Sequence, residues 1–508
     1  MVQLPSVLWR DPEHRIIVQP TATLLSDLNL ERIFAEIAGR GSSPSVDRLL
    51  RAPLLHSEDV EYRRAVFEDL SSPTLRTPLE SFSRAIGEIR RRLTELSMVD
   101  HPILRCRGRL DVLNTYCRTV SALDQSLDGI APESHGLKSW RDFLKTYVDR
   151  AEFQGLVSQC AQTLAELGRI RYSMRIEDRR IVLDEAGGAP DYTATVENLL
   201  EPFLDGWTPA EPDSIPWSTS VHPVEERVLD ELAQMFPLPF GRMMKHADSG
   251  SEFVDPVIER VADELQFYFS YLRLVDRLSA LGLEFCLPEV TDSFEGIRVQ
   301  GAYDLALAVK RADEGILPVT NDYRLTDNER IIVVTGPNQG GKSTFARMFG
   351  QVAYFAALGC PVPARQARVM LTDGISTHFE RPEHSSDAAG RLQSELSAIG
   401  QTLEHATERT IIILNESFSS TASVDARQIG EKVLRRISER KSIAVFVTFI
   451  DELSRLDGIV SMVAGIGGDP TLRTFKLERK PADGRAYAAA LADRFDLSYE
   501  TIVGRVTR

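Results

Sequence analysis

Apolar residues return every three or four positions between residues 49 and 123, which is the spacing of amphipathic helices. The same spacing predicts long helices over residues 136–167 and 254–281. After Gly282 the pattern changes, and short β-branched runs alternate with helical stretches. The chain is therefore predicted to have a mainly helical first part and a mixed α/β second part.

A β-hairpin is predicted between the helices of the first part. Residues 169–176 alternate polar with apolar side chains, a turn follows at Glu177 and Asp178, and residues 180–183 resume the apolar run. The apolar face carries Ile170, Tyr172, Met174 and Ile176. Arginines on or beside the other face can grip DNA phosphates without reading sequence, and a solvated strand face is the alternative. The candidate DNA contacts are Arg169, Arg171, Arg175, Arg179 and Arg180.

A phosphate-binding loop is predicted in the second part. A β-branched run at residues 330–334 leads directly into the motif G-x-x-x-x-G-K-S, and a helical pattern follows through Leu358. In this setting the backbone N–H groups face an anion, Lys342 reaches the β- and γ-phosphates, and the Ser343 hydroxyl binds magnesium. We therefore expect ATP and Mg²⁺ as cofactors. The expected nucleotide contacts are Gly336, Pro337, Asn338, Gln339, Gly340, Gly341, Lys342, Ser343 and Thr344.

A second apolar strand, at residues 410–414, ends in the polar pair Asn415 and Glu416. A P-loop enzyme needs a group near magnesium and a group that orients the attacking water at such a strand end. Glu416 is the candidate for activating water, and Asn415 is expected to contact magnesium through a bound water. A strand end capped by solvated polar residues is the alternative. A third core strand, at residues 443–447, ends in Thr448 and Phe449.

Composition and charge narrow the class of protein without deciding its function. The 508 residues are 43% hydrophobic and 26% charged, as in an ordinary globular protein. No stretch is apolar for long enough to form a signal peptide or to cross a bilayer, so a cytoplasmic protein without a membrane partner is expected. The net charge of -15 argues against indiscriminate coating of nucleic acid, but a local basic surface can still bind DNA.

The motifs resemble those of the MutS family of DNA mismatch-repair ATPases. Residues 335–344 match the family's opening T-G-P-N-x-G-G-K-S-T, in which Asn338 is more family-specific than the P-loop pattern itself. Later segments that resemble family motifs are residues 357–364, 387–395, 416–425 and 447–453, with a weaker likeness over 480–490. Upstream, residues 50–70 and 264–307 resemble the family's helical core and lever helix. The hairpin lies where the family places its DNA clamp.

The resemblance implies further site residues and a partner. In this family the ATPase domains pair, and a Ser/Thr-rich loop of one subunit completes the nucleotide site of the other. A homodimer through the ATPase domain is therefore expected, with a polar connecting turn as the alternative for the loop. The nucleotide-site residues that the resemblance adds are Glu395, Ser420 and Thr421.

Three departures from the family pattern bear on catalysis. Asn415 stands where the family has Asp, Phe449 where it has His, and Ser420 where it has Gly. We therefore expect ATP binding to be better preserved than rapid hydrolysis. Family members that find mismatches also carry an amino-terminal domain with a Phe-x-Glu wedge, and residues 1–45 are too few for it. A short member without that mismatch-reading domain is the resulting expectation.

The sequence thus predicts a multidomain protein with a mainly α-helical region and an α/β ABC-type P-loop ATPase domain. The expected parts are a helical core (1–120), lever helices with a clamp-like β insert (121–300) and the ATPase domain (301–508). The predicted function is an ATP-dependent DNA-binding clamp with slow hydrolysis. It would act in mismatch repair or on branched and recombination DNA. A nucleotide-gated protein-interaction module, with weak or no hydrolysis and no DNA binding, remains open.

Overall fold

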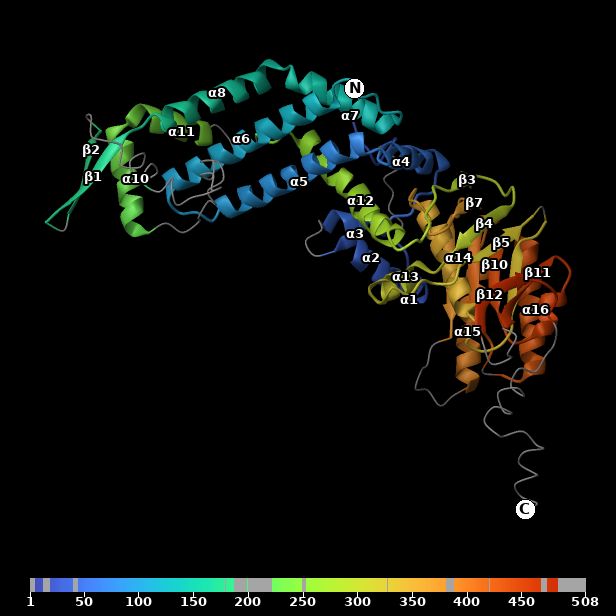
Figure 1. Cartoon of the computed structure of the whole chain (residues 1–508). Coiled ribbons are helices and arrows are strands. Elements are labelled where there is room, and N and C mark those ends of the chain that lie inside the picture. The colour runs from blue at the N-terminus through green and yellow to red at the C-terminus, as the bar shows by residue number, and fades with distance from the viewer. Residues whose placement is uncertain are drawn as a thin grey trace. The chain divides into compact units, whose positions relative to one another are not determined.

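The computed structural model describes most of the chain, and Figure 1 shows its course. The described residues are 5–11, 19–39, 44–178, 180–186, 199, 222–248, 253–326, 328–380, 388–419, 421–466 and 473–482. Contacts between residues divide the chain into two compact units. Unit 1 comprises Met1–Pro5, Thr74–Ala131 and Lys138–Asp263, and unit 2 comprises Ser6–Pro73, Pro132–Leu137 and Glu264–Arg508. The domain boundaries expected at residues 120 and 300 stay predictions.

Unit 1 is built mainly from long helices. Its elements are α5 (Pro73–Leu96), α6 (Pro102–Leu127), most of α7 (His135–Val148), α8 (Ala151–Gly168), β1 (Tyr172–Glu177), β2 (Arg180–Glu185), α10 (Pro223–Met235), α11 (Pro237–Asp248) and the first turns of α12 (Pro256–Ser279). Helices α6 and α8 pack side by side, and the predicted hairpin follows α8 directly (Figure 1). The hairpin and the helices expected around it are confirmed, with one exception.

That exception concerns residues 136–167, which form two helices where the apolar spacing predicts one. The chain becomes extended at Arg150, between α7 and α8. The Arg150 guanidinium turns back over the rings of Phe143 and Tyr147, at 5.8 Å and 5.7 Å from their centroids. Apolar spacing continues on both sides of this break, so the pattern alone does not reveal it.

Unit 2 is organised around a six-stranded sheet with the order β12-β11-β6-β10-β9-β8. Its strands are β6 (Ile331–Thr335), β8 (Gly374–Phe379), β9 (Thr410–Asn415), β10 (Ile443–Val447), β11 (Ile459–Ile466) and β12 (Arg473–Arg479). All neighbours pair in parallel except β11 with β12. Strands β6 and β10 are buried along their whole length, which is why they read as uninterrupted apolar runs. The three predicted core strands are confirmed.

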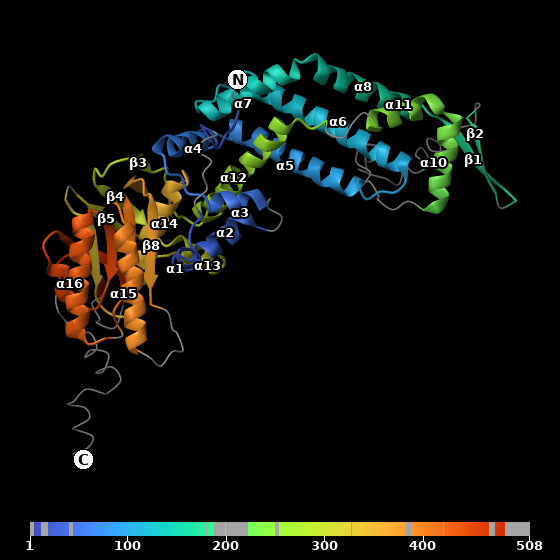
Figure 2. The same cartoon turned by 180° about the vertical axis from the view of Figure 1, so that it is seen from behind.

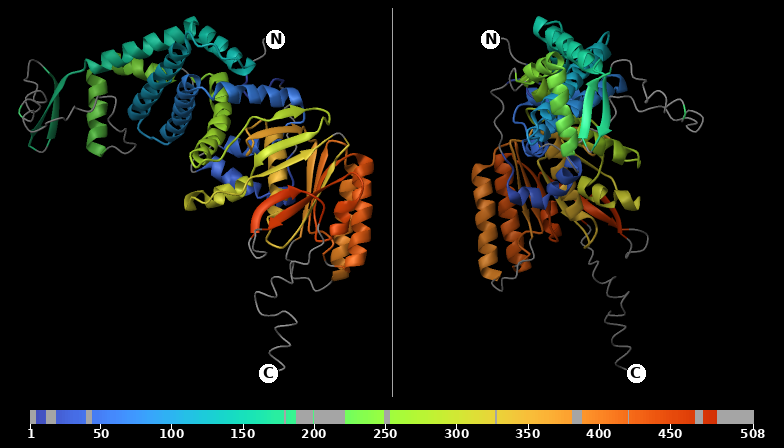
Figure 3. Two further views of the ribbon diagram at one scale, coloured as in Figure 1. Left: turned by 45° about the vertical axis from the view of Figure 1, so that its right-hand side comes forward. Right: turned by 90° about the vertical axis from the view of Figure 1, so that its left-hand side faces the viewer.

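Helices cover both faces of this sheet. Side chains from α15 (Ala388–His405) and α16 (Ser423–Arg440) join a buried cluster with Ile412 and Leu414 of β9. Figure 2 shows these two helices side by side on one face, and Figure 3 shows the same pair in two further views. Ile413, which points to the opposite face, lies against Gly350 of α14 (Lys342–Ala357). Helix α14 therefore packs on the other side of the sheet.

Smaller elements complete unit 2. A four-stranded sheet has the order β3-β7-β4-β5. Its strands are β3 (Glu289–Thr291), β4 (Ile297–Ala302), β5 (Asn321–Leu325) and β7 (Gln366–Met370). The helices are α1 (Ala22–Asp27), α2 (Leu30–Ala38), α3 (Pro44–Leu50), α4 (Ser57–Asp69) and α13 (Leu305–Arg311). The expectation of a multidomain, largely helical chain with mixed sheets is thus confirmed. Among the described helices, none is both long and apolar enough to span a membrane.

A row of polar side chains on α14 forms hydrogen bonds with the segments that contain the smaller helices α1 and α3. Arg347 donates to the carbonyl oxygen of Asp27, and Tyr354 donates to that of Leu50. Gln351 lies between them on the helix. Because the three side chains recur at helical spacing, they form one face of α14.

Gln351 is the buried centre of this row, with no exposed surface. Its amide nitrogen donates to the Leu28 carbonyl and to the Asp304 carboxylate, at 2.9 Å each. Its carbonyl oxygen accepts from the backbone N–H of Leu305 at 2.8 Å. One side chain therefore bonds α14 both to the segment after α1 and to the start of α13.

Replacing Gln351 with leucine is expected to loosen this junction. The Gln351→Leu variant leaves the Leu28 carbonyl, the Leu305 N–H and the Asp304 carboxylate buried without that partner. The expected loss of local stability is about 2–4 kcal/mol. Hydrogen-exchange mass spectrometry of the peptide that contains α13 should show faster exchange. Gln401→Leu, at an exposed position on α15, is the control. Unchanged exchange at α13 would contradict the structural role of Gln351.

Candidate functional site

The predicted phosphate-binding loop lies between a buried strand and a buried helix. It leaves β6 at Gly336 and enters α14 at Lys342. Gly336 and Gly341 have φ angles of 118° and 92°, which glycine adopts without strain. A Cβ added at Gly336 would lie 2.9 Å from the Cβ of Ala464 in β11, so a larger residue has no room. The loop is therefore fixed against the sheet, and it leads into the helix N-terminus, whose N–H groups suit an anion.

Lys342 is a buried cation at the start of α14. Only 4% of the residue is exposed, and its Nζ donates to the carbonyl oxygens of Gly336 and Pro337, both at 3.0 Å. Burial lowers the pKa of Lys342, whereas the nearby carboxylate of Glu416 raises it and Arg473 adds to the lowering. A desolvated ammonium gains strongly from an anionic partner, so this position suits a phosphate group.

Asn415 and Glu416 lie at the same edge of the sheet as the loop, because β9 and β6 are both parallel neighbours of β10. The backbone N–H of Glu416 donates to the carbonyl of Val447, the last residue of β10, at 2.9 Å. Glu416 has a left-handed φ of 58°, and Phe418 has one of 67°. Such backbone angles cost free energy and persist only where the surroundings hold them. The turn therefore keeps the half-buried Glu416 side chain in a defined place.

The oxygen atoms around this edge fit a magnesium ion. Asn415 is 7% exposed, and its Oδ1 has no hydrogen-bond partner among the described residues. The hydroxyl of Thr335, at the end of β6, is likewise buried without a partner in the described part of the chain. Ser343, in the first turn of α14, is half-buried. Hydroxyl and amide oxygens are hard donors of the type that Mg²⁺ and its bound waters prefer.

Glu395 of α15 anchors the loop that follows β9. It is 7% exposed, and its Oε2 accepts from the backbone N–H of Phe418 at 3.2 Å. His378 of β8 lies 3.9 Å from its other carboxylate oxygen. The bond from Phe418 connects Glu395 to the turn that carries Glu416. Direct contact between Glu395 and a nucleotide stays a prediction.

The Ser/Thr-rich loop leads from this turn into α16. Ser419 is exposed and donates to the Glu380 carboxylate at 2.8 Å, and Thr421 is half-buried. Ser420 lies outside the described residues, as does most of the segment 480–490. The approach of this loop to a second subunit's nucleotide therefore stays a prediction.

Strand β12 brings two residues to the P-loop that sequence reasoning missed. Arg473 donates from Nε to the carbonyl of Asn338 at 3.2 Å. A Cβ added at Gly341 would lie 3.6 Å from the Cα of Phe475, a residue that is 47% exposed. Phe475 also has a left-handed φ of 56°, and Asn321 donates to its carbonyl at 3.1 Å. No local motif marks these residues, because only the pairing of β12 with β11 brings them to the loop.

The hairpin in unit 1 is less basic than its arginines suggest. Residues 169–186 hold five arginines and four carboxylates, which leaves a formal charge of +1. Arg175 pairs with Asp184 at 2.8 Å and with Glu177 at 3.3 Å. Part of the positive charge is therefore neutralised within the hairpin itself.

The remaining candidate DNA contacts differ in their surroundings. Arg171 donates to main-chain carbonyls, whereas Arg169 and Arg180 are exposed. Arg179 lies outside the described residues. The five predicted DNA contacts are thus not equivalent, and they stay predictions.

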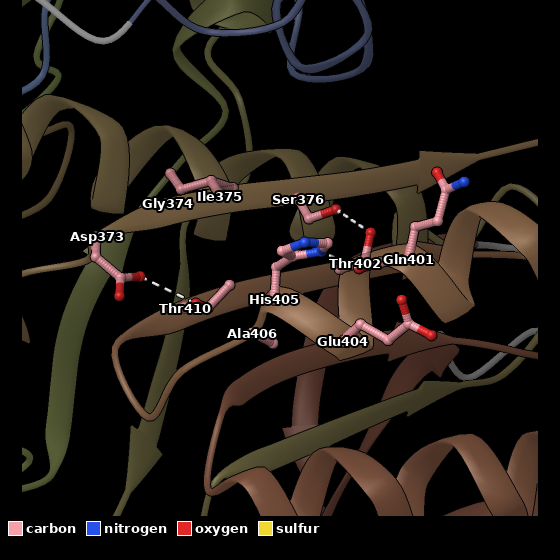
Figure 4. Close-up of a pocket in the computed structure, with 10 residues that line it drawn as sticks. All are labelled: Asp373, Gly374, Ile375, Ser376, Gln401, Thr402, Glu404, His405, Ala406 and Thr410. Atoms are coloured by element: carbon pink, nitrogen blue, oxygen red, sulfur yellow. Dashed lines mark hydrogen bonds between the residues drawn. The ribbon is translucent and has the colours of Figure 1, made fainter.

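A polar pocket lies at the opposite end of the strands from the P-loop. Figure 4 shows its lining, which comes from the amino ends of β8 and β9 and the last turns of α15. Thr410 donates to the Asp373 carboxylate at 3.0 Å, and the hydroxyls of Ser376 and Thr402 lie 3.0 Å apart. This pocket is therefore separate from the edge that carries the P-loop.

Comparison with known proteins points to one family. The family model for MutS domain V matches residues 332–468. The DNA mismatch repair protein MutS 2 of Halobacterium salinarum is 25% identical over 447 residues, covering 80% of this chain and 49% of that protein. The DNA mismatch repair protein MutS of Caldanaerobacter subterraneus subsp. tengcongensis is 26% identical over 263 residues, covering 49% and 29%. The MutS of Caldicellulosiruptor saccharolyticus is 31% identical over 149 residues, covering 28% and 17%. The chain thus spans about half the length of these relatives or less.

Removing the Lys342 ammonium is expected to abolish binding of ATP. The Lys342→Ala variant loses the charge-assisted hydrogen bonds that a buried ammonium gives to phosphate oxygens. The expected loss of affinity is at least about 100-fold. Isothermal titration with a non-hydrolysable ATP analogue measures it. Lys432→Ala, at an exposed position on α16, is the matched control. Normal affinity in Lys342→Ala would refute the assigned P-loop.

Proposed function

Because the chain is a member of the MutS family, we propose that it is an ATP-dependent DNA-binding clamp that acts in DNA mismatch repair or on branched DNA. One observation carries this proposal. The P-loop, Asn415 and Glu416 meet at one edge of a parallel sheet, although about 70 residues of chain separate Lys342 from them. A strand–loop–helix unit with a polar pair at a nearby strand end is the arrangement that phosphoryl-transfer sites use. Unit 2 would accordingly contain an ABC-type P-loop ATPase domain.

In the proposed site the chain holds the nucleotide mainly through its backbone. The N–H groups of the loop and of the first turn of α14 face the phosphates, and Lys342 adds a cation. Ser343 and Asn415 would hold Mg²⁺, with Asn415 acting through water. When bound, the ion neutralises phosphate charge. Because these contacts depend mostly on loop conformation, binding is expected to tolerate changes in the catalytic side chains.

Glu416 is the proposed group that accepts a proton from, or orients, the attacking water. Its backbone is held by Val447, and its carboxylate is near enough to Lys342 to raise the pKa of that ammonium. Asn415 supplies an amide oxygen where a carboxylate would add negative charge near the metal. Weaker attraction for Mg²⁺ follows, and we therefore propose slow hydrolysis.

The proposal includes a homodimer through the ATPase domain. The exposed Ser419 and the half-buried Thr421 border the start of α16, where the apolar Val424 is 60% exposed. An exposed apolar side chain beside small hydroxyl groups suits a surface that a second copy covers. Ser420 would belong to the same contact.

A second function is supported by the hairpin. Its charge is close to neutral, and its apolar face carries Met174, which is 58% exposed, and Ile176, which is 77% exposed. Such a face is better suited to a protein than to a phosphate backbone. A nucleotide-gated protein-interaction module without DNA binding is therefore the competing function.

Gel-shift binding separates these functions. Purified protein is mixed with homoduplex, mismatched and branched DNA, in the absence of nucleotide, with ADP and with a non-hydrolysable ATP analogue. Nucleotide-dependent binding would support the clamp, and the preferred DNA would distinguish mismatch repair from action on branched DNA. No binding to any DNA at low salt would reject the clamp in favour of the interaction module.

Replacing Glu416 is expected to stop turnover while sparing binding. The Glu416→Gln variant keeps the shape of the side chain but cannot accept the proton of water. The expected fall in the ATP hydrolysis rate is about 100- to 10,000-fold. Steady-state phosphate release measures it, and titration with the ATP analogue checks binding. Glu431→Gln on α16 is the control. If turnover stays at the wild-type rate, Glu416 is not the base.

The hairpin arginines are expected to differ in their contribution to DNA binding. In the Arg169→Ala/Arg180→Ala double variant, two exposed cations are lost, and the slope of log affinity against log salt should become shallower by about 2. Arg175→Ala should change the slope much less, because Asp184 and Glu177 already neutralise Arg175. Fluorescence anisotropy on duplex DNA at several salt concentrations measures both. A slope equal to that of the wild type in the Arg169→Ala/Arg180→Ala variant would show that these two arginines do not contact phosphates.

A further inference from the structure

The ring of Phe449 contacts the ammonium of the P-loop lysine. The Nζ of Lys342 lies 4.3 Å from the centroid of this ring. Phe449 follows β10 by two residues, and the intervening Thr448 is anchored on both sides. Its N–H donates to the carbonyl of Val334 at 3.0 Å, and its hydroxyl accepts from the N–H of Ile450 at 3.1 Å. The backbone at the base of the ring is therefore fixed to β6, the strand that carries the P-loop.

We propose that Phe449 is a positioning residue of the nucleotide site. Its ring holds the Lys342 ammonium inside the P-loop when no nucleotide is bound. An incoming phosphate then has to displace the ring from the ammonium. Phe449 thereby lowers the affinity for nucleotide. This inference rests on the proposed ATP site.

The contacts of Lys342 explain why an incoming phosphate competes with the ring for the ammonium. An ammonium has three N–H donors, and two carbonyls of the loop accept from it at 3.0 Å each. The negative face of an aromatic ring attracts the same cation. A phosphate that binds Lys342 accepts hydrogen bonds from N–H donors that the two carbonyls otherwise use. It also contacts the surface of the ammonium that the ring otherwise covers. The carbonyls belong to the loop itself, so the ring is the partner that a substitution can remove without altering the loop.

The exposure of the two partners makes the displacement feasible. Lys342 is 4% exposed, so its ammonium depends on protein groups, whereas Phe449 is 50% exposed. The ring can therefore turn into solvent without opening a buried cavity. Among the described residues, the charged groups that act on Lys342 are the carboxylate of Glu416 and the guanidinium of Arg473. Both remain when only the ring is changed, so an effect of the ring can be separated from theirs.

The ring's electrostatic role can be tested without changing its shape much. Position 449 of the full-length protein is filled with phenylalanines that carry increasing numbers of ring fluorines, which weaken the negative face stepwise. Two quantities are measured. The rate at which an amine-specific reagent labels Lys342 in the nucleotide-free protein, relative to the exposed Lys432, reports how firmly the ammonium is held. Titration with a fluorescent non-hydrolysable ATP analogue reports affinity.

The expected result is a stepwise change in both quantities. Each weakening of the ring's negative face should speed the labelling of Lys342, because the ring then holds the ammonium less firmly inside the loop. Affinity for the ATP analogue should rise by about two- to fivefold across the series. Phe449→Leu should lie at the end of the series. The same fluorinated residues at Phe285, which packs edge-on against Tyr303, are the control and should leave both quantities unchanged.

Other outcomes have separate meanings. A flat series in either quantity, in a protein that binds the ATP analogue, would overturn the positioning role of Phe449. Failure of every variant and of the wild type to bind the analogue would instead overturn the proposed ATP site. The labelling series would then still decide whether the ring holds the ammonium, because it is measured without nucleotide.

Discussion

The parallel ladder of β9, β10 and β6 is the constraint on which the site depends. Backbone hydrogen bonds at the ends of these strands continue past the strands themselves. Glu416 donates to Val447 at 2.9 Å, and Thr448 donates to Val334 at 3.0 Å. Each bond fixes the first residues after one strand to the last residues of its neighbour. The carboxyl ends of parallel strands meet at one edge, so three segments distant in sequence are brought to the same place.

The same helix that begins at the P-loop also organises the rest of unit 2. Helix α14 presents Arg347, Gln351 and Tyr354 to carbonyls of the amino-terminal segments, while Gly350 allows Ile413 of β9 to approach closely. Buried polar groups of this kind tolerate little displacement, because each lost hydrogen bond leaves a desolvated partner. A movement of the P-loop end of α14 would therefore disturb the hydrogen bonds that this face of the helix makes. It has to involve the segments to which that face is bonded.

The sequence predicts those parts of the site whose signals are local. The strand, glycine loop and helix of the P-loop are contiguous, and β9 and β10 read as apolar runs because both of their faces are buried. Contacts made across the fold leave no such signal. Arg473 and Phe475 reach the loop through the position of β12 in the sheet, and Phe449 reaches Lys342 through the hydrogen bonds that follow β10. The neutralisation of Arg175 depends likewise on the register of the hairpin strands.

In the proposed site, nucleotide binding and hydrolysis would rest on different groups, so binding could persist where hydrolysis weakens. Nucleotide binding would use backbone N–H groups, whose placement is set by the loop glycines and the sheet beneath them. Hydrolysis would depend on individual side chains near the proposed metal and the attacking water, where this chain has the neutral groups Asn415 and Phe449. Within the described part of the chain, Glu416 is then the one carboxylate that acts on Lys342. A site that bound through its backbone and hydrolysed through so few side chains would keep its nucleotide intact for longer, which is what the proposed nucleotide-controlled clamp requires.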